Sequence, residues 1–253
     1  MTDILIVVVA GLVAGALNAV GGGGTFVALP ALVLVGLEPV TANAASTIAL
    51  VPGAVASAWV YRHDIRPVGA ASTRALGVVS VVGGVAGACL LLVLPSRSFG
   101  AAVPWLLAFA TLLLIFGRPL TGYLGRATDR QFTLGPRAVL AGQFVLAVYG
   151  GYFGGAVGIM MLALWSLGLG IDTSTGNPMR VVQLAAIYLS SATVFLFASP
   201  ATHHPLILLA MVTGAVAGGF AGARLARRLP PRLLRGAILT TATTTTVLYF
   251  ARG

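Results

Sequence analysis

The chain has 253 residues, of which 58% are hydrophobic and only 8% are charged, and its mean hydropathy is +1.01. A soluble globule needs more polar surface than this composition supplies, so the sequence indicates an integral membrane protein. The apolar residues fall into several runs near the roughly 20 residues that a bilayer-spanning helix needs, with short loops between them. No room remains for a separate soluble domain.

The formal net charge of +10 comes from 15 arginines, with no lysine, set against five acidic residues. Twelve of the arginines fall in three segments between apolar runs: Arg62, Arg66 and Arg74; Arg118, Arg126, Arg130 and Arg137; and Arg224, Arg227, Arg228, Arg232 and Arg235. A nucleic-acid site would need basic residues gathered on one exposed face beside aromatic side chains, whereas this distribution follows the positive-inside rule. We therefore expect membrane lipids but no nucleic acid as partners, and we place the three segments in the cytoplasm.

Apolar runs and helix breakers predict two sets of helices in the same order. The first set comprises Ile4–Val20, a short helix at Thr25–Val35, then Thr41–Tyr61, Ala75–Leu94 and Gly100–Phe116. The second set comprises Val139–Tyr149, a short helix at Ala156–Leu169, then Ser174–Phe197, Pro205–Gly222 and Gly236–Phe250. We therefore divide the chain into a first transmembrane repeat at residues 1–117, a cytoplasmic connecting loop at 118–136 and a second transmembrane repeat at 137–253.

The two halves pair with one another when one is slid along the other. A single offset pairs Gly21 with Gly155, Gly24 with Gly158, Gly36 with Gly170, Glu38 with Asp172, Thr41 with Thr175 and Asn43 with Asn177. One added residue then pairs Leu94-Pro95-Ser96-Arg97 with Leu229-Pro230-Pro231-Arg232. The shared order and spacing of these matches predict an internal duplication.

Two acidic residues indicate that the halves have opposite orientations. With the arginine-rich segments inside, Glu38 lies outside, whereas its mate Asp172 lies inside, because an even number of crossings separates Asp172 from the preceding basic segment. Inverted repeats are typical of secondary transporters, whose substrate site lies near the midplane between the repeats. The predicted fold is an all-α integral membrane protein of two inverted repeats, with about eight transmembrane helices including short, re-entrant half-helices.

A glycine-rich stretch precedes each short helix: NAVGGGGTFVALP, Asn18–Pro30, and YGGYFGGAVG, Tyr149–Gly158. A helix of about 11 residues is roughly 17 Å long and cannot cross a hydrocarbon core of about 30 Å. Irregular backbone at this depth is tolerated only inside protein or beside water, where free N–H groups and the positive end of a helix dipole favour an anion. The alternative, that the glycines only let helices pack closely, stays open.

A polar stripe at helical spacing follows each glycine cluster: Asn43, Ser46 and Thr47 in the first half, and Asn177, Arg180 and Gln183 in the second. Arg180 is about two turns into a span, where a buried charge costs roughly 2.5 to 3.5 kcal/mol. Its planar fork of donors suits an oxyanion. The alternative, that Arg180 snorkels to the cytoplasmic surface, stays open.

The remaining reactive residues argue against an enzyme or a metal site. The five acids, Asp3, Glu38, Asp64, Asp129 and Asp172, fall at loops or chain ends, so no intramembrane carboxylate is predicted. This favours an anionic substrate over a cation or proton. Cys89 is the single cysteine, and no H-E-x-x-H or G-x-S-x-G motif occurs. We expect no catalytic residue, no cofactor and no metal ion.

Five stretches of the chain carry a resemblance to a known family: VGGGGTFVALPAL, ANAASTIALVPGAVASAWVYRHDI, YGGYFGGAVGIMMLAL, GNPMRVV and GGFAGARLARRLPPRLLR. In this order and spacing they resemble the sulfite exporter TauE/SafE family of bacterial membrane transporters, over nearly the whole chain. The resemblance implies transport of sulfite, sulfonates or related small organic anions. It places Gly21 to Gly24, Asn43, Gly154, Gly155, Gly158, Asn177 and Arg180 on family motif positions.

We therefore expect a secondary transporter, or permease, that exports or exchanges a small anion such as sulfite or an organosulfonate across the bacterial cytoplasmic membrane. The residues expected to line the substrate site are Gly21, Gly22, Gly23, Gly24, Asn43, Ser46, Gly154, Gly155, Gly158, Asn177, Arg180 and Gln183. A non-transporting membrane scaffold or assembly factor stays open, and it would satisfy every buried polar group and leave no cavity. A passive anion channel and a homo-oligomer also stay open.

Overall fold

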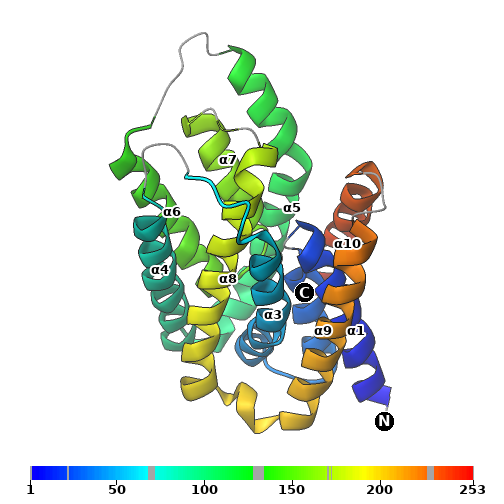
Figure 1. Ribbon diagram of the computed structural model, residues 1–253. Helices are drawn as coiled ribbons and strands as arrows, with labels where there is room; N and C mark the ends of the chain where they lie inside the picture. Colours follow the sequence, from blue (N-terminus) through cyan, green and yellow to red (C-terminus); the bar gives the residue numbers. More distant parts are fainter. Residues whose placement is uncertain are drawn as a thin grey trace.

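The computed structural model describes residues 2–21, 23–67, 72–127, 134–169, 171, 173–226 and 231–252. In these ranges the chain forms α-helices, one short 3₁₀-helix and no strand (Figure 1). The elements are α1 (Thr2–Gly21), α2 (Thr25–Leu34), α3 (Pro39–Tyr61), α4 (Thr73–Val93), α5 (Ser96–Ala127), α6 (Pro136–Tyr152), α7 (Val157–Leu169), α8 (Thr173–Ala198), η1 (Pro200–His203), α9 (Pro205–Ala226) and α10 (Pro231–Arg252). The all-α prediction is confirmed for the described part of the chain.

Several helices extend beyond their predicted ends, and α5 and α6 do so into the segments expected to be a loop and a break. α5 continues from Phe116 to Ala127, so the first part of the segment expected to be a loop at 118–136 is helical, and residues 128–133 lie outside the description. α6 continues past Tyr149 through Gly150 and Gly151 to Tyr152. A Cβ at Gly151 would collide with the main-chain carbonyl of Gly84 in α4, so this glycine allows close packing inside a helix and does not interrupt it.

Among the described residues, six helical segments are long and apolar enough to cross a membrane: Thr2–Ala19, Pro39–Tyr61, Thr73–Val93, Ser96–Leu113, Thr175–Ala198 and Pro205–Gly222. Large apolar side chains also cover the outside of the bundle, such as Trp105 with 70% and Phe197 with 89% of its surface exposed. The chain is therefore a multi-pass membrane protein. The two predicted short helices are present: α2 has 10 residues and α7 has 13. They are roughly 15 and 20 Å long, shorter than the hydrocarbon core.

Glycines bring two pairs of helices into backbone contact. α1 lies along α9, where a Cβ at Gly15 or Gly218 would collide with the main chain of the other helix. α4 lies along α6 in the same way, where a Cβ at Gly87 would come within 2.7 Å of the Tyr152 nitrogen. In membranes, such small-residue faces let helices approach closely and gain van der Waals contact.

The helices α3 and α8 lie side by side in the middle of the bundle and run in opposite directions (Figure 1). The segment that follows α3 shares a pocket with the start of α8, so the end of one helix adjoins the beginning of the other. Every residue of α3 from Val40 to Leu50 is buried. Polar side chains on this part of α3 therefore face protein and not lipid.

A proline inside α2 is compensated by α10. In a regular α-helix the carbonyl of Phe26 would accept a hydrogen bond from residue 30, but Pro30 has no N–H group. The Thr245 hydroxyl of α10 donates to this carbonyl instead, at 3.0 Å, and both are buried. The next residue, Thr246, bonds to Ala242 in its own helix and to Thr111 of α5. α10 thus holds α2 and α5 in place.

Candidate functional site

The two glycine-rich breaks contact one another in the interior. Gly154 lies between α6 and α7 with φ +82°, and a Cβ built on it would lie 3.3 Å from the Thr25 hydroxyl oxygen. Thr25 is the first residue of α2. The Tyr188 hydroxyl of α8 donates to the Gly154 carbonyl at 3.1 Å. The start of the first short helix therefore meets the turn that precedes the second, although more than 120 residues separate them in the chain.

The second break turns sharply before α7 begins. Gly154 and Ala156 both have positive φ, +82° and +59°, and for alanine this left-handed conformation costs about 1–2 kcal/mol. The turn leads into the first turn of α7, where the Ile159 and Met160 amides donate to the Ala156 carbonyl at 3.0 and 3.1 Å, and the Val157 and Gly158 amides come before them. Gly158, in this first turn, is buried. The positive end of the α7 dipole therefore lies in the interior.

Arg180 lies against this first turn of α7. Its side chain is only 4% exposed, and its Nε donates to the Asn177 Oδ1 at 3.0 Å. A Cβ on Gly158 would come within 2.7 Å of the Arg180 Nη1, so only glycine leaves room for the guanidinium. The alternative in which Arg180 snorkels to the surface is therefore wrong. A guanidinium and a helix N-terminus at one place form a strongly anion-attracting environment.

Asn43 occupies a different setting on α3. The side chain is fully buried, and its Nδ2 donates to the carbonyl of Tyr152, the last residue of α6, at 2.9 Å. Its Oδ1 has no hydrogen-bond partner. The hydroxyls of Ser46 and Thr47 both donate to the Asn43 main-chain carbonyl, at 2.8 and 3.0 Å. The first-half stripe thus lies at the C-terminal end of α6.

The side chain of Gln183 belongs to a buried polar chain that links three helices. Its Oε1 accepts from the Ser80 hydroxyl of α4 at 2.8 Å, and Ser80 in turn accepts from the Gln143 Nε2 of α6 at 2.9 Å. The Gln183 Nε2 donates to the Met179 sulfur at 3.3 Å. The structure therefore engages the Gln183 amide in helix contacts, and its role toward a substrate stays a prediction.

The remaining glycines of the expected site are Gly21 to Gly24 and Gly155, and those whose surroundings are described pack against other parts of the protein. Gly23 and Gly24 are buried before α2, and a Cβ on Gly24 would meet the Ala14 carbonyl oxygen at 2.7 Å. Gly155 lies against the ring of Phe153. Gly21 ends α1, and Gly22 lies outside the described residues.

Four buried residues near these breaks were not among the predicted site residues. Thr25 and Tyr188 contact Gly154, and the side-chain oxygens of Asn18 and Gln143 lack hydrogen-bond partners. Asn18 and Thr25 flank the glycine cluster directly, so their position in the sequence was an available signal. Tyr188 and Gln143 carry no comparable signal.

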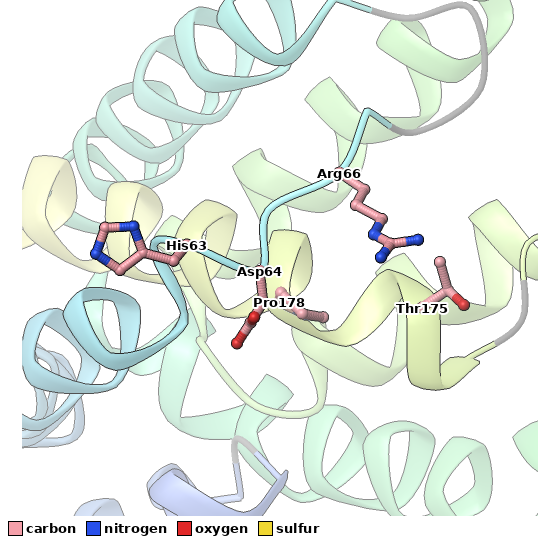
Figure 2. Close-up of a pocket in the computed structure, with 5 residues that line it drawn as sticks. All are labelled: His63, Asp64, Arg66, Thr175 and Pro178. Atoms are coloured by element: carbon pink, nitrogen blue, oxygen red, sulfur yellow. The ribbon is translucent and has the colours of Figure 1, made fainter.

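A polar pocket lies at the end of the bundle where α3 ends and α8 begins (Figure 2). Its volume is about 340 Å³, and it is lined by His63, Asp64, Arg66, Thr175 and Pro178. Figure 2 shows the Arg66 side chain extending toward Thr175, whereas His63 points away from both. Pro178 lies between Asn177 and Arg180 on the same helix. The pocket therefore adjoins the segment of α8 that carries the buried guanidinium.

The described residues bring no three His, Cys, Asp or Glu side chains together into a group that could hold a metal ion. The buried polar groups of the described residues include side-chain amides, hydroxyls, the Trp165 indole N–H and the Arg180 guanidinium.

The family model described as "Sulfite exporter TauE/SafE" matches residues 7–249, nearly the whole chain. No curated protein and no solved structure matches.

Proposed function

The chain belongs to the sulfite exporter TauE/SafE family, and from this premise we propose that it is a secondary transporter for a small anion. The substrate is sulfite or an organosulfonate, which the protein exports or exchanges across the bacterial cytoplasmic membrane. Membership of a transporter family also accords with the expectation that the chain is not an enzyme.

One observation carries the proposal: the buried Arg180 guanidinium lies against the first turn of α7. Sulfite and sulfonate groups present several oxygens that accept hydrogen bonds from a planar guanidinium and from main-chain amides together. Asn177 accepts from the Nε of the guanidinium, and the Nη1 lies close to Gly158 in the first turn of α7. We propose that the anion binds between Arg180 and the amides around Gly158.

We also propose that the two halves, residues 1–117 and 137–253, are inverted repeats, with α2 and α7 as re-entrant half-helices. The offset that relates the halves relates α1 to α6 and α4 to α9, and these elements pack as α1 with α9 and α4 with α6. The spacing that pairs Leu94 with Leu229 also pairs Thr111 with Thr246, and these two hydroxyls are 2.9 Å apart. Equivalent contacts in both halves are what a two-fold relation between them requires.

The pocket near Arg66 supports a route from the cytoplasm to the proposed site. The segment after α3 is one of the three arginine-rich segments placed inside by the positive-inside rule. From this pocket, Thr175 and Pro178 lead along α8 toward Arg180. Arg66 and the N-terminus of α8 attract an anion to the mouth of this route. The negative charge of Asp64 weakens this attraction, so the anion is not held at the mouth and can move on toward Arg180.

Unsatisfied polar atoms argue against a purely structural scaffold. Such a protein has no reason to leave buried acceptors unpaired, because each costs about 1–3 kcal/mol. The side-chain oxygens of Asn18, Asn43 and Gln143 are all buried without a partner. Groups of this kind suit a protein that binds water, ions or solutes inside the membrane.

The test is transport by the purified chain in proteoliposomes, with sulfite, sulfate, thiosulfate, sulfoacetate and small carboxylates offered under gradients in both directions. We expect one or more of these anions to move, and Arg180→Ala to abolish most of the flux. Arg62→Ala is the matched control, because Arg62 is exposed and stacks on Trp59 at 4.2 Å outside the site. If no anion moves with the wild type, the transporter proposal is wrong; if Arg180→Ala transports like Arg62→Ala, the proposed site is wrong.

A further inference from the structure

The Oδ1 of Asn43 is a buried acceptor with no partner, and its direction is fixed. The Nδ2 must face the Tyr152 carbonyl, since a carbonyl accepts a hydrogen bond only from the amide nitrogen. The oxygen therefore points to the other side, and the side chain has no exposed surface. An amide oxygen held in this way in a membrane interior needs a ligand from outside the protein chain.

Two hydroxyl groups follow Asn43 on the same helix, three and four residues along the chain. Ser46 and Thr47 direct their hydrogens to the Asn43 main-chain carbonyl, so the lone pairs of both hydroxyl oxygens remain available. Both side chains are buried, at 0% and 4% exposure. The cluster consists of neutral oxygens only, which are the ligands that hard cations prefer.

The electrostatic setting favours a positive ligand. Asn43 contacts Tyr152, where α6 ends, and the carbonyl groups of a last helical turn form the negative end of the helix dipole. Helix C-terminal ends and free carbonyl groups inside the membrane are the typical surroundings of a coupling cation in secondary transporters. The C-terminal end of α6 thus favours a cation at Asn43, whereas the N-terminal end of α7 favours an anion at Arg180; the N-terminus of α2 also lies near this break, at Gly154.

In the second half, the atom that corresponds to the Asn43 Oδ1 is the Asn177 Oδ1, and it has a cationic partner. The offset that pairs Asn43 with Asn177 also pairs Ser46 with Arg180. In the second half the cationic Arg180 donates to the Asn177 Oδ1, whereas Ser46 brings no charge to the Asn43 Oδ1. We propose that an alkali-metal cation, Na⁺ or K⁺, binds the Asn43 Oδ1 with the hydroxyl oxygens of Ser46 and Thr47. This inference rests on the pairing of the repeats in the proposed function.

The absence of a carboxylate from these three residues favours a monovalent ion over Ca²⁺ or Mg²⁺, whose sites normally include carboxylates. Binding of the cation together with the anion would couple the two movements. Cells keep K⁺ high inside and Na⁺ high outside, so a K⁺ site would drive the anion outward and a Na⁺ site would drive it inward. The preferred ion therefore indicates the direction of coupled transport.

The test uses the full chain in detergent or nanodiscs, with none of the candidate substrate anions present. Thermal unfolding is followed in NaCl, KCl and N-methyl-D-glucamine chloride at equal ionic strength, together with direct binding of radioactive Na⁺ and of Rb⁺ as a K⁺ analogue. We expect a saturable rise in Tm with at least one alkali cation. Ser46→Ala should weaken the apparent affinity by about tenfold, because it removes one ligand oxygen.

Ser57→Ala is the matched control, since Ser57 also lies on α3 and bonds only to the Gly53 carbonyl of its own helix. Asn43→Leu removes the central ligand and should abolish cation binding. Because this change also breaks the bond to Tyr152, Ser46→Ala decides the question if Asn43→Leu does not fold. Equal stabilisation by all three salts with no bound Na⁺ or Rb⁺ would mean that only water fills the site, and it would overturn the inference.

An unchanged affinity in Ser46→Ala would overturn the inference as well. A chain that binds the cation but moves no anion keeps this inference and loses the proposed function. A chain that moves an anion but binds no cation loses this inference alone.

Discussion

Asn43 and Asn177 are matched by the internal offset, yet they adjoin opposite kinds of helix end. The Asn43 amide lies at the C-terminal end of α6 with its oxygen unpartnered. The Asn177 oxygen accepts from Arg180, whose guanidinium lies at the N-terminal turn of α7. Two stripe residues distinguish the settings, because Ser46 is matched to Arg180 and Thr47 is matched to Val181. A duplicated framework can therefore present a cation-favouring and an anion-favouring end through few substitutions, because helix termini supply much of the field.

The largest expected effect is a difference between two alanine variants, at the matched glycines Gly24 and Gly158: one should lose stability and the other anion flux. A Cβ on Gly24 would meet the Ala14 carbonyl oxygen at 2.7 Å and the Leu50 Cδ2 at 3.0 Å, within a tightly packed contact of α1, α2 and α3. Gly24→Ala should therefore lower the free energy of unfolding by about 1–3 kcal/mol, through overpacking. A Cβ on Gly158 would instead meet the Arg180 Nη1, the end of a flexible side chain.

Gly158→Ala should accordingly keep its stability but displace the guanidinium, and anion flux should fall by about tenfold, as expected for a lost charged hydrogen bond. Thermal unfolding and proteoliposome flux are measured on both variants. The comparison fails if Gly24→Ala loses flux without losing stability, or if Gly158→Ala unfolds as readily as Gly24→Ala.

The sequence predicted the positions of the helices well, because apolar runs and helix-breaking residues are local signals. The short helices α2 and α7 were predicted from glycine clusters and length alone. These local signals failed where contact with a distant segment of the chain determines whether a helix continues. Gly150 and Gly151 read as a break, but Gly151 lies inside α6 because the Gly84 carbonyl passes against it.

The candidate site was predictable in part for the same reason. Asn43, Asn177 and Arg180 stand out as polar residues inside apolar spans, whereas the burial of Arg180 depends on how closely α7 approaches α8 at Gly158. The Gln183 amide oxygen accepts from Ser80 of α4, which lies 103 residues away in the chain, so the sequence alone gave no reason to assign this amide to helix contacts.

The hydrogen bond from Thr245 to the Phe26 carbonyl stabilises α2, and the matched helix α7 has no need of such a bond. Pro30 deprives the Phe26 carbonyl of its helical donor, while the residue matched to Pro30 in α7 is Leu164, which keeps its N–H group. Thr245→Val leaves the Phe26 carbonyl buried and unpaired, so the free energy of unfolding should fall by about 1–2 kcal/mol.

Thr193→Val is the control, because Thr193 is exposed and bonds only to the Leu189 carbonyl of its own helix. Denaturation of the two variants in the same detergent measures the difference. Equal stability of the two would show that another donor reaches Phe26, and the asymmetry between α2 and α7 would then not depend on α10.

The smallest effect concerns the backbone of the second break. Ala156 has φ +59°, and the same offset matches it to Gly22. Ala156→Gly removes the strain of a left-handed alanine, about 1–2 kcal/mol, but gives the unfolded chain more freedom, worth about 0.4–1 kcal/mol. A net gain of about 0.5 kcal/mol is expected from these opposed terms. Ala163→Gly, inside α7, should instead lose about 1 kcal/mol, since glycine is a poor helix former. Opposite signs in the two melting-temperature shifts would establish that the turn before α7 is held in a conformation suited to glycine. A loss of stability in both variants would rule this out.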